Sequence, residues 1–186
     1  MTETKAVIFD LDGVIVSTDE YHYQAWKRIS ETEGIKFDRQ DNEKLRGVSR
    51  MESLELILAN ATKTYTEDQK LQLADTKNNV YRELLNNLSE SDILPGVKDI
   101  LSGLKEKGIK IAIGSSSKNA PFILKQIGLP SEFDCIVDGN DIKNSKPDPE
   151  VFLLAANKLG VEPDRCVVVE DAEAGILAAV AAGMKT

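Results

Sequence analysis

The sequence predicts an α/β protein with a doubly wound parallel sheet and a helical domain inserted after its first strand. Short, continuous apolar runs indicate strands buried on both faces of a sheet. They lie at residues 6–9, 109–113, 133–137 and 166–169. Helical patterns separate the later runs, and strands that alternate with helices are typical of βαβ units in a parallel sheet. The exception is the interval 14–94, which carries helical patterns only.

Helices are predicted where apolar residues recur at helical spacing and then stop at a glycine. Gly108, Gly128 and Gly160 end three such patterns, and a glycine there suits a left-handed C-cap. A last helix is predicted over 172–182. The four residues after it, 183–186, stand where another strand should begin, so we expect the final strand of the fold to be missing from this chain.

The domain boundaries follow from the long helical interval. We expect a core α/β domain formed by residues 1–14 and 95–186, and a helical cap domain formed by residues 15–94. Pro95-Gly96 is a turn signal and marks the return to the core.

Composition excludes several classes of function. The 186 residues carry a net charge of −8 with no basic stripe, which argues against nucleic acid and anionic membranes as partners. No apolar stretch approaches the length of a membrane span, and the N-terminus lacks the shape of a signal peptide. Cys135 and Cys166 are isolated among apolar neighbours, as expected of reduced core thiols. We expect a cytoplasmic monomer.

Two pairs of acids follow two of the predicted strands. Asp10 and Asp12 come directly after the first, and Glu170 and Asp171 after the last. Alone, the first pair could be an Asp-Gly turn and the second ordinary acids of a helix N-terminus. Together they would lie at one sheet edge and repel by several kcal/mol at about 4 Å. A bound cation removes that cost, and oxygen ligands favour Mg²⁺.

Two further features belong to the same edge of the sheet. Ser115-Ser116-Ser117 follows the second strand and is expected to open a helix, where hydroxyls and free N–H groups bind anions or simply cap the helix. Lys146 precedes Pro147 in a stiff turn after the third strand. A lone loop lysine is usually solvated, but Pro147 and Pro149 are expected to hold this one at the same sheet edge as the acids.

Taken in order, these motifs resemble the haloacid dehalogenase superfamily over essentially the whole chain. The resemblance implies that Asp10 is a covalent nucleophile, that Asp12 is a general acid and base, and that Lys146 and Ser115 hold the transferring phosphoryl group. It also implies Mg²⁺ on Asp10, the Asp12 carbonyl, Glu170 and Asp171. The resemblance further implies that dehalogenating members lack the second aspartate, so the presence of Asp12 makes an alcohol or sugar hydroxyl the expected leaving group.

The inserted domain resembles the cap of phosphosugar mutases in that superfamily, in residues 18–26 and 45–50. The resemblance implies that Thr18 and His22, neighbours on one helix face, position Asp12 when the cap closes. It implies a phosphoglucose as the substrate and β-glucose 1,6-bisphosphate as the phosphoryl donor that primes the enzyme. The substrate-binding residues implied are Trp26, Arg46, Gly47, Val48, Ser49, Arg50, Ser53, Ser116, Ser117, Lys118 and Asn119. Family members commonly carry Lys where this chain has Arg46, and Trp26 also suits plain packing.

Two alternatives remain open. A sugar-phosphate phosphatase of the same superfamily would share the core but let water reach the phosphoenzyme. A non-catalytic phosphosugar-binding module would be expected to lose an acid, and all four are present. A dinucleotide-binding Rossmann domain is excluded, because no Gly-x-Gly-x-x-Gly follows any strand.

Overall fold

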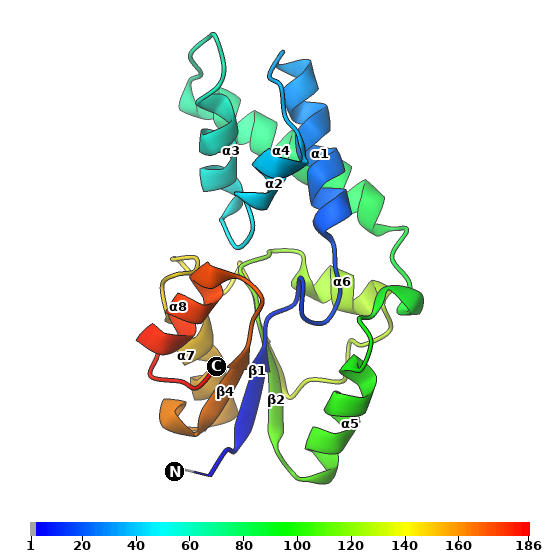
Figure 1. The fold of residues 1–186 in the computed structure, drawn as a ribbon, viewed down its shortest axis with the longest axis vertical. Helices are drawn as coiled ribbons and strands as arrows, with labels where there is room; N and C mark the ends of the chain where they lie inside the picture. Colours follow the sequence, from blue (N-terminus) through cyan, green and yellow to red (C-terminus); the bar gives the residue numbers. More distant parts are fainter. Residues whose placement is uncertain (1–2) are drawn as a thin grey trace. The chain divides into compact units, whose positions relative to one another are not determined.

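The computed structural model describes residues 3–186, which form two compact units (Figure 1). One unit runs to Ser17 and resumes at Leu88, and the other spans Thr18–Asn87. Residues 15–17 and 88–94 belong to the first unit because Val16 forms an antiparallel bridge with Ile93 and the N–H of Leu94 donates to the carbonyl of Ile15 at 2.9 Å. The chain therefore leaves and re-enters the first unit through one short pairing.

The first unit is built on a four-stranded parallel sheet in the order β3-β2-β1-β4. Its strands are β1 (Ala6–Phe9), β2 (Lys110–Gly114), β3 (Cys135–Val137) and β4 (Cys166–Val169). The predicted doubly wound parallel sheet is confirmed. Phe9 lies opposite both Ile113 of β2 and Val169 of β4, so the carboxyl ends of these three strands meet at one edge.

Helices cover both faces of this sheet. They are α5 (Val97–Glu106), α6 (Ala120–Gln126), α7 (Glu150–Leu159) and α8 (Glu173–Ala181), with short 3-10 turns η1 (Glu90–Asp92) and η2 (Pro163–Arg165). In Figure 1, α7 and α8 lie on one side of the sheet and α5 on the other. Phe152 of α7 is fully buried against the strands. Gly160 ends α7 with φ of 65°, which confirms the left-handed cap.

Beyond α8 the chain turns back along β4. The N–H of Val168 donates to the carbonyl of Lys185 at 2.8 Å, and the N–H of Lys185 donates to the carbonyl of Cys166. Lys185 thereby continues the sheet beside β4, on the side away from β1. Both cysteines are free thiols, and burial raises the pKa of Cys166 to about 11. A thiol with a pKa this high stays protonated at neutral pH.

The second unit is entirely helical. It consists of α1 (Asp19–Thr32), α2 (Arg39–Glu43), α3 (Arg50–Leu58) and α4 (Glu67–Leu85). Its core gathers Trp26 of α1, Leu54 and Ile57 of α3, and Ala74 of α4. Among the described residues, no helix of either unit is long and apolar enough to cross a membrane.

Candidate functional site

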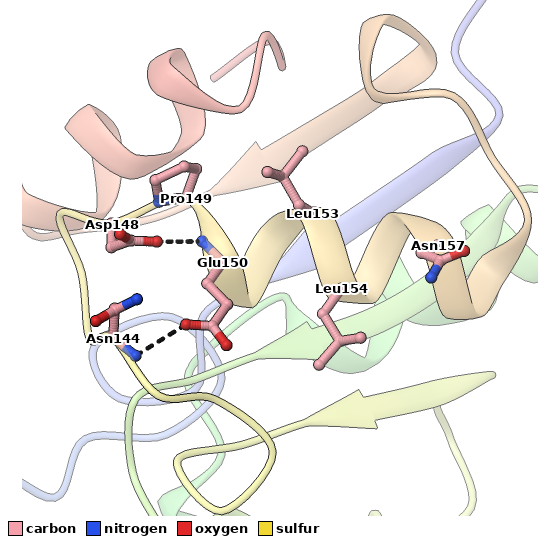
Figure 2. A pocket seen from close by; sticks show the side chains of 7 residues that line it. All are labelled: Asn144, Asp148, Pro149, Glu150, Leu153, Leu154 and Asn157. Carbon is pink, nitrogen blue, oxygen red and sulfur yellow. Dashed lines mark hydrogen bonds between the residues drawn. The ribbon is translucent and has the colours of Figure 1, made fainter.

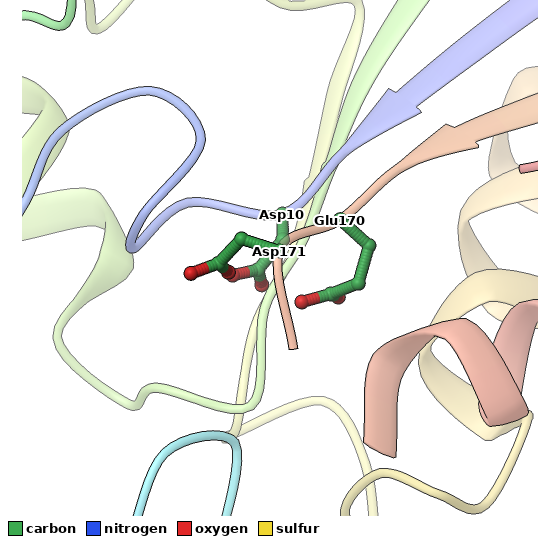
Figure 3. Close-up of side chains that lie close together, drawn as sticks. All are labelled: Asp10, Glu170 and Asp171. Carbon is green, nitrogen blue, oxygen red and sulfur yellow. The ribbon is translucent and has the colours of Figure 1, made fainter. Parts of the chain in front are cut away.

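The carboxylates of Asp10, Glu170 and Asp171 converge at the carboxyl ends of β1 and β4 (Figure 3). One oxygen from each lies within 4.8 Å of the others. The in-register pairing of β1 and β4 brings them together, and the N–H of Asp10 donates to the carbonyl of Val169 at 2.9 Å. Their chemistry is that of a hard-cation site made of oxygen ligands.

Lys146 lies against these acids and is almost fully buried. Its ammonium donates to Oδ1 of Asp10 at 2.6 Å and to Oε2 of Glu170 at 2.7 Å. Burial alone would lower the pKa of Lys146, but the two carboxylates raise it above its ordinary value. Lys146 is therefore a fixed positive charge beside Asp10.

The acid cluster also fits a magnesium ion. Burial, together with the charge of Asp10, raises the pKa of Glu170 above its ordinary value even beside Lys146, so the cluster favours further positive charge. Two glycines make room for the carboxylates. A Cβ on Gly13 would lie 2.1 Å from Oδ2 of Asp171, and one on Gly175 would lie 1.9 Å from Oε2 of Glu170. Larger residues there would displace both acids.

The serine segment after β2 differs from the expectation. Ser115, Ser116 and Ser117 do not open a helix, because α6 begins at Ala120. Instead the N–H of Ser117 donates to Oγ of Ser115 at 3.1 Å, and the N–H of Asn119 donates to Oγ of Ser117 at 3.2 Å. The two hydroxyls close backbone turns, which sequence pattern alone does not distinguish from helix caps.

Ser116 is the exception in that segment. Its hydroxyl is buried, and it has no hydrogen-bond partner among the described residues. A buried hydroxyl of this kind is costly unless a ligand or water satisfies it. Lys118, two residues on, is exposed, and its carbonyl accepts from Nδ2 of Asn140. The segment therefore offers two groups to a ligand, the hydroxyl of Ser116 and the ammonium of Lys118. Hydrogen bonds fix the turn beside them.

Within the helical unit, two pairs of side chains face each other across α1 and α4. Thr18 and His22 are four residues apart at the start of α1, and Lys77 and Tyr81 are four residues apart on α4. Oγ1 of Thr18 lies 2.8 Å from the hydroxyl of Tyr81, and Nζ of Lys77 lies 2.9 Å from Nδ1 of His22. These four residues are the α1–α4 quartet.

Sequence reasoning missed Lys77 and Tyr81. The signal was present, because Ala74, Lys77, Tyr81 and Leu85 recur at helical spacing and form the buried stripe of α4. A lysine in an otherwise apolar stripe is unusual. Lys77 is only 2% exposed, and its ammonium lies over the rings of Trp26 and Tyr81 at 4.7 and 4.6 Å.

The ring of His22 is held in its neutral form in this arrangement. Burial, then the positive charges of Lys77 and Arg50, hold the pKa of His22 well below its ordinary value of 6.5. An ammonium can only donate, so Nδ1 of His22 accepts from Lys77 and the ring proton resides on Nε2. The resemblance implies that His22 positions Asp12, and the contact with Lys77 indicates which ring nitrogen carries the proton.

The predicted substrate-binding segment of the helical unit joins α2 to α3. The guanidinium of Arg46 is paired with Asp19 and, through Nε at 3.3 Å, with Glu43. Arg50 opens α3 and is partly buried, and desolvation lowers its pKa without removing its charge. Both side chains therefore keep a positive charge in this unit.

The neighbours of these arginines have mainly structural contacts. Oγ of Ser49 caps α3 in a capping box with Glu52, Ser53 is buried in α3, and Trp26 is packed in the helical core. Gly47 adopts φ of 72° and turns the chain before Val48.

A separate open depression of about 410 Å³ lies beside the start of α7 (Figure 2). Its carboxylates already serve the backbone: Glu150 accepts from the N–H groups of Lys143 and Asn144, and Asp148 accepts from the N–H of Glu150. The remaining lining is Pro149, Leu153, Leu154 and Asn157. Nothing there matches the density of reactive groups at the acid cluster.

Comparisons with known proteins agree with this geometry. Residues 4–183 match the family described as haloacid dehalogenase-like hydrolase. The chain is 50% identical to β-phosphoglucomutase of Bacillus subtilis, over 97% of this chain and 80% of that protein. It is 34% identical to a phosphorylated carbohydrates phosphatase of Thermotoga maritima, over 97% and 82%. A crystal structure of β-phosphoglucomutase from Clostridium difficile superposes with a TM-score of 0.93 at 45% identity, over 97% and 82%.

A parallel α/β fold in which two adjacent strands end in clustered acids, with a buried lysine bonded to Asp10, is typical of an enzyme of the phosphoryl-transfer class. Within that class, the chain belongs to the haloacid dehalogenase-like hydrolase family.

Proposed function

We propose that this protein is a β-phosphoglucomutase that interconverts β-glucose 1-phosphate and glucose 6-phosphate, primed by β-glucose 1,6-bisphosphate. The observation that carries the proposal is that each unit supplies its own positive charge. Lys146 donates to Asp10 in the first unit, and Arg50 keeps its charge at the start of α3 in the helical unit. A mutase needs both, because its intermediate carries two phosphates.

The reaction begins with Asp10. Lys146 binds Oδ1 of Asp10, which leaves Oδ2 to attack the phosphorus of the bisphosphate. An Oδ2–P bond forms and the P–O bond to the sugar breaks, giving an aspartyl phosphate and a sugar alkoxide. Ser115 and Lys146 hold the transferring phosphoryl group. In the second half of the cycle a hydroxyl of the bound sugar phosphate attacks, and Asp10 is regenerated.

Mg²⁺, held by Asp10, the carbonyl of Asp12, Glu170 and Asp171, supplies charge neutralisation of the phosphoryl oxygens when it is bound.

The remaining residues handle the proton and the distal phosphate. Asp12 protonates the leaving alkoxide and later deprotonates the attacking hydroxyl. Thr18 and His22 position Asp12, with His22 acting as an Nε2–H donor. Arg50, Ser117, Lys118 and Asn119 bind the non-reacting phosphate through charge-assisted hydrogen bonds.

The roles of the remaining predicted residues need adjustment. The guanidinium of Arg46 is already paired with Asp19 and Glu43, so we assign it to a sugar hydroxyl. Ser49 acts through the start of α3, because its hydroxyl already caps that helix. Gly47, Val48, Ser53 and Ser116 complete the proposed substrate-binding set, with the orphan hydroxyl of Ser116 available to a phosphate oxygen.

A sugar-phosphate phosphatase is the second candidate, favoured by the 34% identity to the phosphatase of Thermotoga maritima. It would use the same Asp10 chemistry but transfer the phosphoryl group to water. The test is to supply β-glucose 1-phosphate with Mg²⁺ and the bisphosphate primer and to quantify glucose 6-phosphate and inorganic phosphate together. The proposal predicts glucose 6-phosphate with little free phosphate. Binding of the sugar phosphate without any turnover would favour a non-catalytic module.

A further inference from the structure

Thr18 occupies the N-cap position of α1, yet its side chain does not cap the helix. No N–H of the first turn donates to its hydroxyl, although threonine at this position usually makes that bond. The hydroxyl instead lies 2.8 Å from that of Tyr81, in a buried contact between residues 63 positions apart. The Thr18 hydroxyl thus does not cap α1. It is bound instead by the hydroxyl of Tyr81 on α4.

Tyr81 also fixes the other members of the α1–α4 quartet. Its ring centroid lies 4.1 Å from that of His22, at an interplanar angle of 43°. The ammonium of Lys77 lies over the same ring at 4.6 Å. Tyr81 is 1% exposed, so this one side chain simultaneously holds the hydroxyl of Thr18, the ring of His22 and the cation that binds Nδ1 of His22.

We propose that Tyr81 is a positioning residue of the phosphoryl-transfer reaction, acting through Thr18 and His22. The inference rests on the proposed function, in which those two residues orient the general acid and base Asp12. Either hydroxyl could donate in this contact, and we assign the donation to Tyr81, because a phenol O–H is a stronger donor than an alkyl O–H. With that assignment, the proton of Thr18 is directed to another acceptor. Such a chain of hydroxyls strengthens and orients the final donor.

Removing only the phenol oxygen isolates this role. Tyr81→Phe keeps the ring against His22 and Lys77 but loses the bond to Thr18. Tyr65→Phe is the matched control, because the hydroxyl of Tyr65 in the same helical unit donates to Oε2 of Glu33 at 2.8 Å, outside the quartet. Thr18→Val and the Tyr81→Phe/Thr18→Val double variant complete a double-mutant cycle.

We expect Tyr81→Phe to lower kcat roughly five- to fifty-fold with little change in KM, and Tyr65→Phe to retain wild-type kcat. If Tyr81 acts through Thr18, the double variant should be no slower than the slower single variant. Wild-type kcat in Tyr81→Phe, or losses that simply multiply in the double variant, would overturn the inference. An equal loss of kcat in Tyr65→Phe and Tyr81→Phe would also overturn the inference, since both losses would then reflect reduced stability.

A second measurement keeps this inference separate from the proposed function. His22 is the only histidine in the chain, so its ring signals in NMR spectra need no assignment. Tyr81→Leu removes the ring that buries His22 and should move its titration upward, while Tyr81→Phe should leave it unchanged. An unchanged titration in Tyr81→Leu contradicts the positioning role whatever the activity. A wild-type protein that only hydrolyses sugar phosphates would instead overturn the mutase assignment.

Discussion

Asp10 owes its proposed reactivity to the residues around it. It is nearly buried, and its carboxylate is held through one oxygen by the fixed charge of Lys146. The same lysine binds Glu170, so the positive charge that orients the nucleophile also offsets repulsion within the acid cluster. A carboxylate oriented in this way needs little reorganisation before it attacks phosphorus.

Asp10→Asn should therefore leave the fold intact and lower turnover by at least about a thousandfold, because an amide does not attack phosphorus. Steady-state kinetics would measure the loss, and mass spectrometry of the acid-trapped wild type should find the phosphoryl adduct on Asp10. Asp99→Asn, an exposed acid in the first turn of α5, is the control and should remain active. An adduct on a serine or on His22 would contradict the assignment.

His22 gives a pH-dependent prediction. Its pKa is depressed in the folded chain, so below about pH 6.5 the unfolded chain binds the extra proton first. The free energy of unfolding should then fall with decreasing pH, by at most about 1.4 kcal/mol per pH unit from this group. The fall in the free energy of unfolding begins near the pKa of His22 in the unfolded chain and ends near its pKa in the folded chain. Chemical denaturation at several pH values should show a shallower slope for His22→Gln, and equal slopes would contradict the assigned pKa direction.

Lys77 controls the same titration. Lys77→Met removes a positive charge and the hydrogen bond that Nδ1 of His22 accepts. In the wild type, both of these interactions favour the neutral ring of His22. The pKa of His22 should therefore rise in Lys77→Met, as measured by NMR. Lys70→Met is a suitable control, because Lys70 lies on α4 but pairs with Glu55 and Glu67. A shift of equal size in both variants would argue against the direct contact.

Elements differ in how far the sequence predicts them. The four strands follow from apolar runs, because parallel strands buried on both faces leave that pattern. Glycines such as Gly160 mark helix ends because the left-handed turn requires them. At Ser115–Ser117 the sequence predicts a helix start and the structure has backbone turns, since hydroxyls bind backbone N–H groups in either case. Helical spacing places Lys77 on the buried stripe of α4, but its contact with His22 depends on how α4 packs against α1, which local sequence does not specify.

The start of α3 offers a test at the level of one element. Ser49→Ala should destabilise the protein by about 1 kcal/mol, because it removes the cap. It should also weaken substrate binding indirectly, since Arg50 is the first residue of α3. Ser49→Asn restores a capping side chain and should recover both stability and KM. Recovery of stability without recovery of KM would instead assign the Ser49 hydroxyl to the substrate.

At the scale of the whole molecule, the acid cluster links metal binding to stability. Mg²⁺ at a hundred times its dissociation constant should raise the free energy of unfolding by about 2.7 kcal/mol, and a chelator should reverse this and stop turnover. Ca²⁺, which prefers a looser geometry, should not restore activity. Glu170→Gln should lose most of the Mg²⁺-dependent stabilisation while Asp99→Asn keeps it. Full activity in chelator would contradict the metal site.

The central claim is that the phosphoryl group is returned to a sugar and not to water. The most direct measurement follows β-glucose 1-phosphate by ³¹P NMR in the presence of Mg²⁺ and β-glucose 1,6-bisphosphate, beside the Arg50→Ala variant. We predict that the wild type accumulates glucose 6-phosphate with little inorganic phosphate. Arg50→Ala should isomerise roughly ten- to a hundred-fold more slowly. Inorganic phosphate that appears as fast as substrate disappears would contradict the account and identify the protein as a phosphatase.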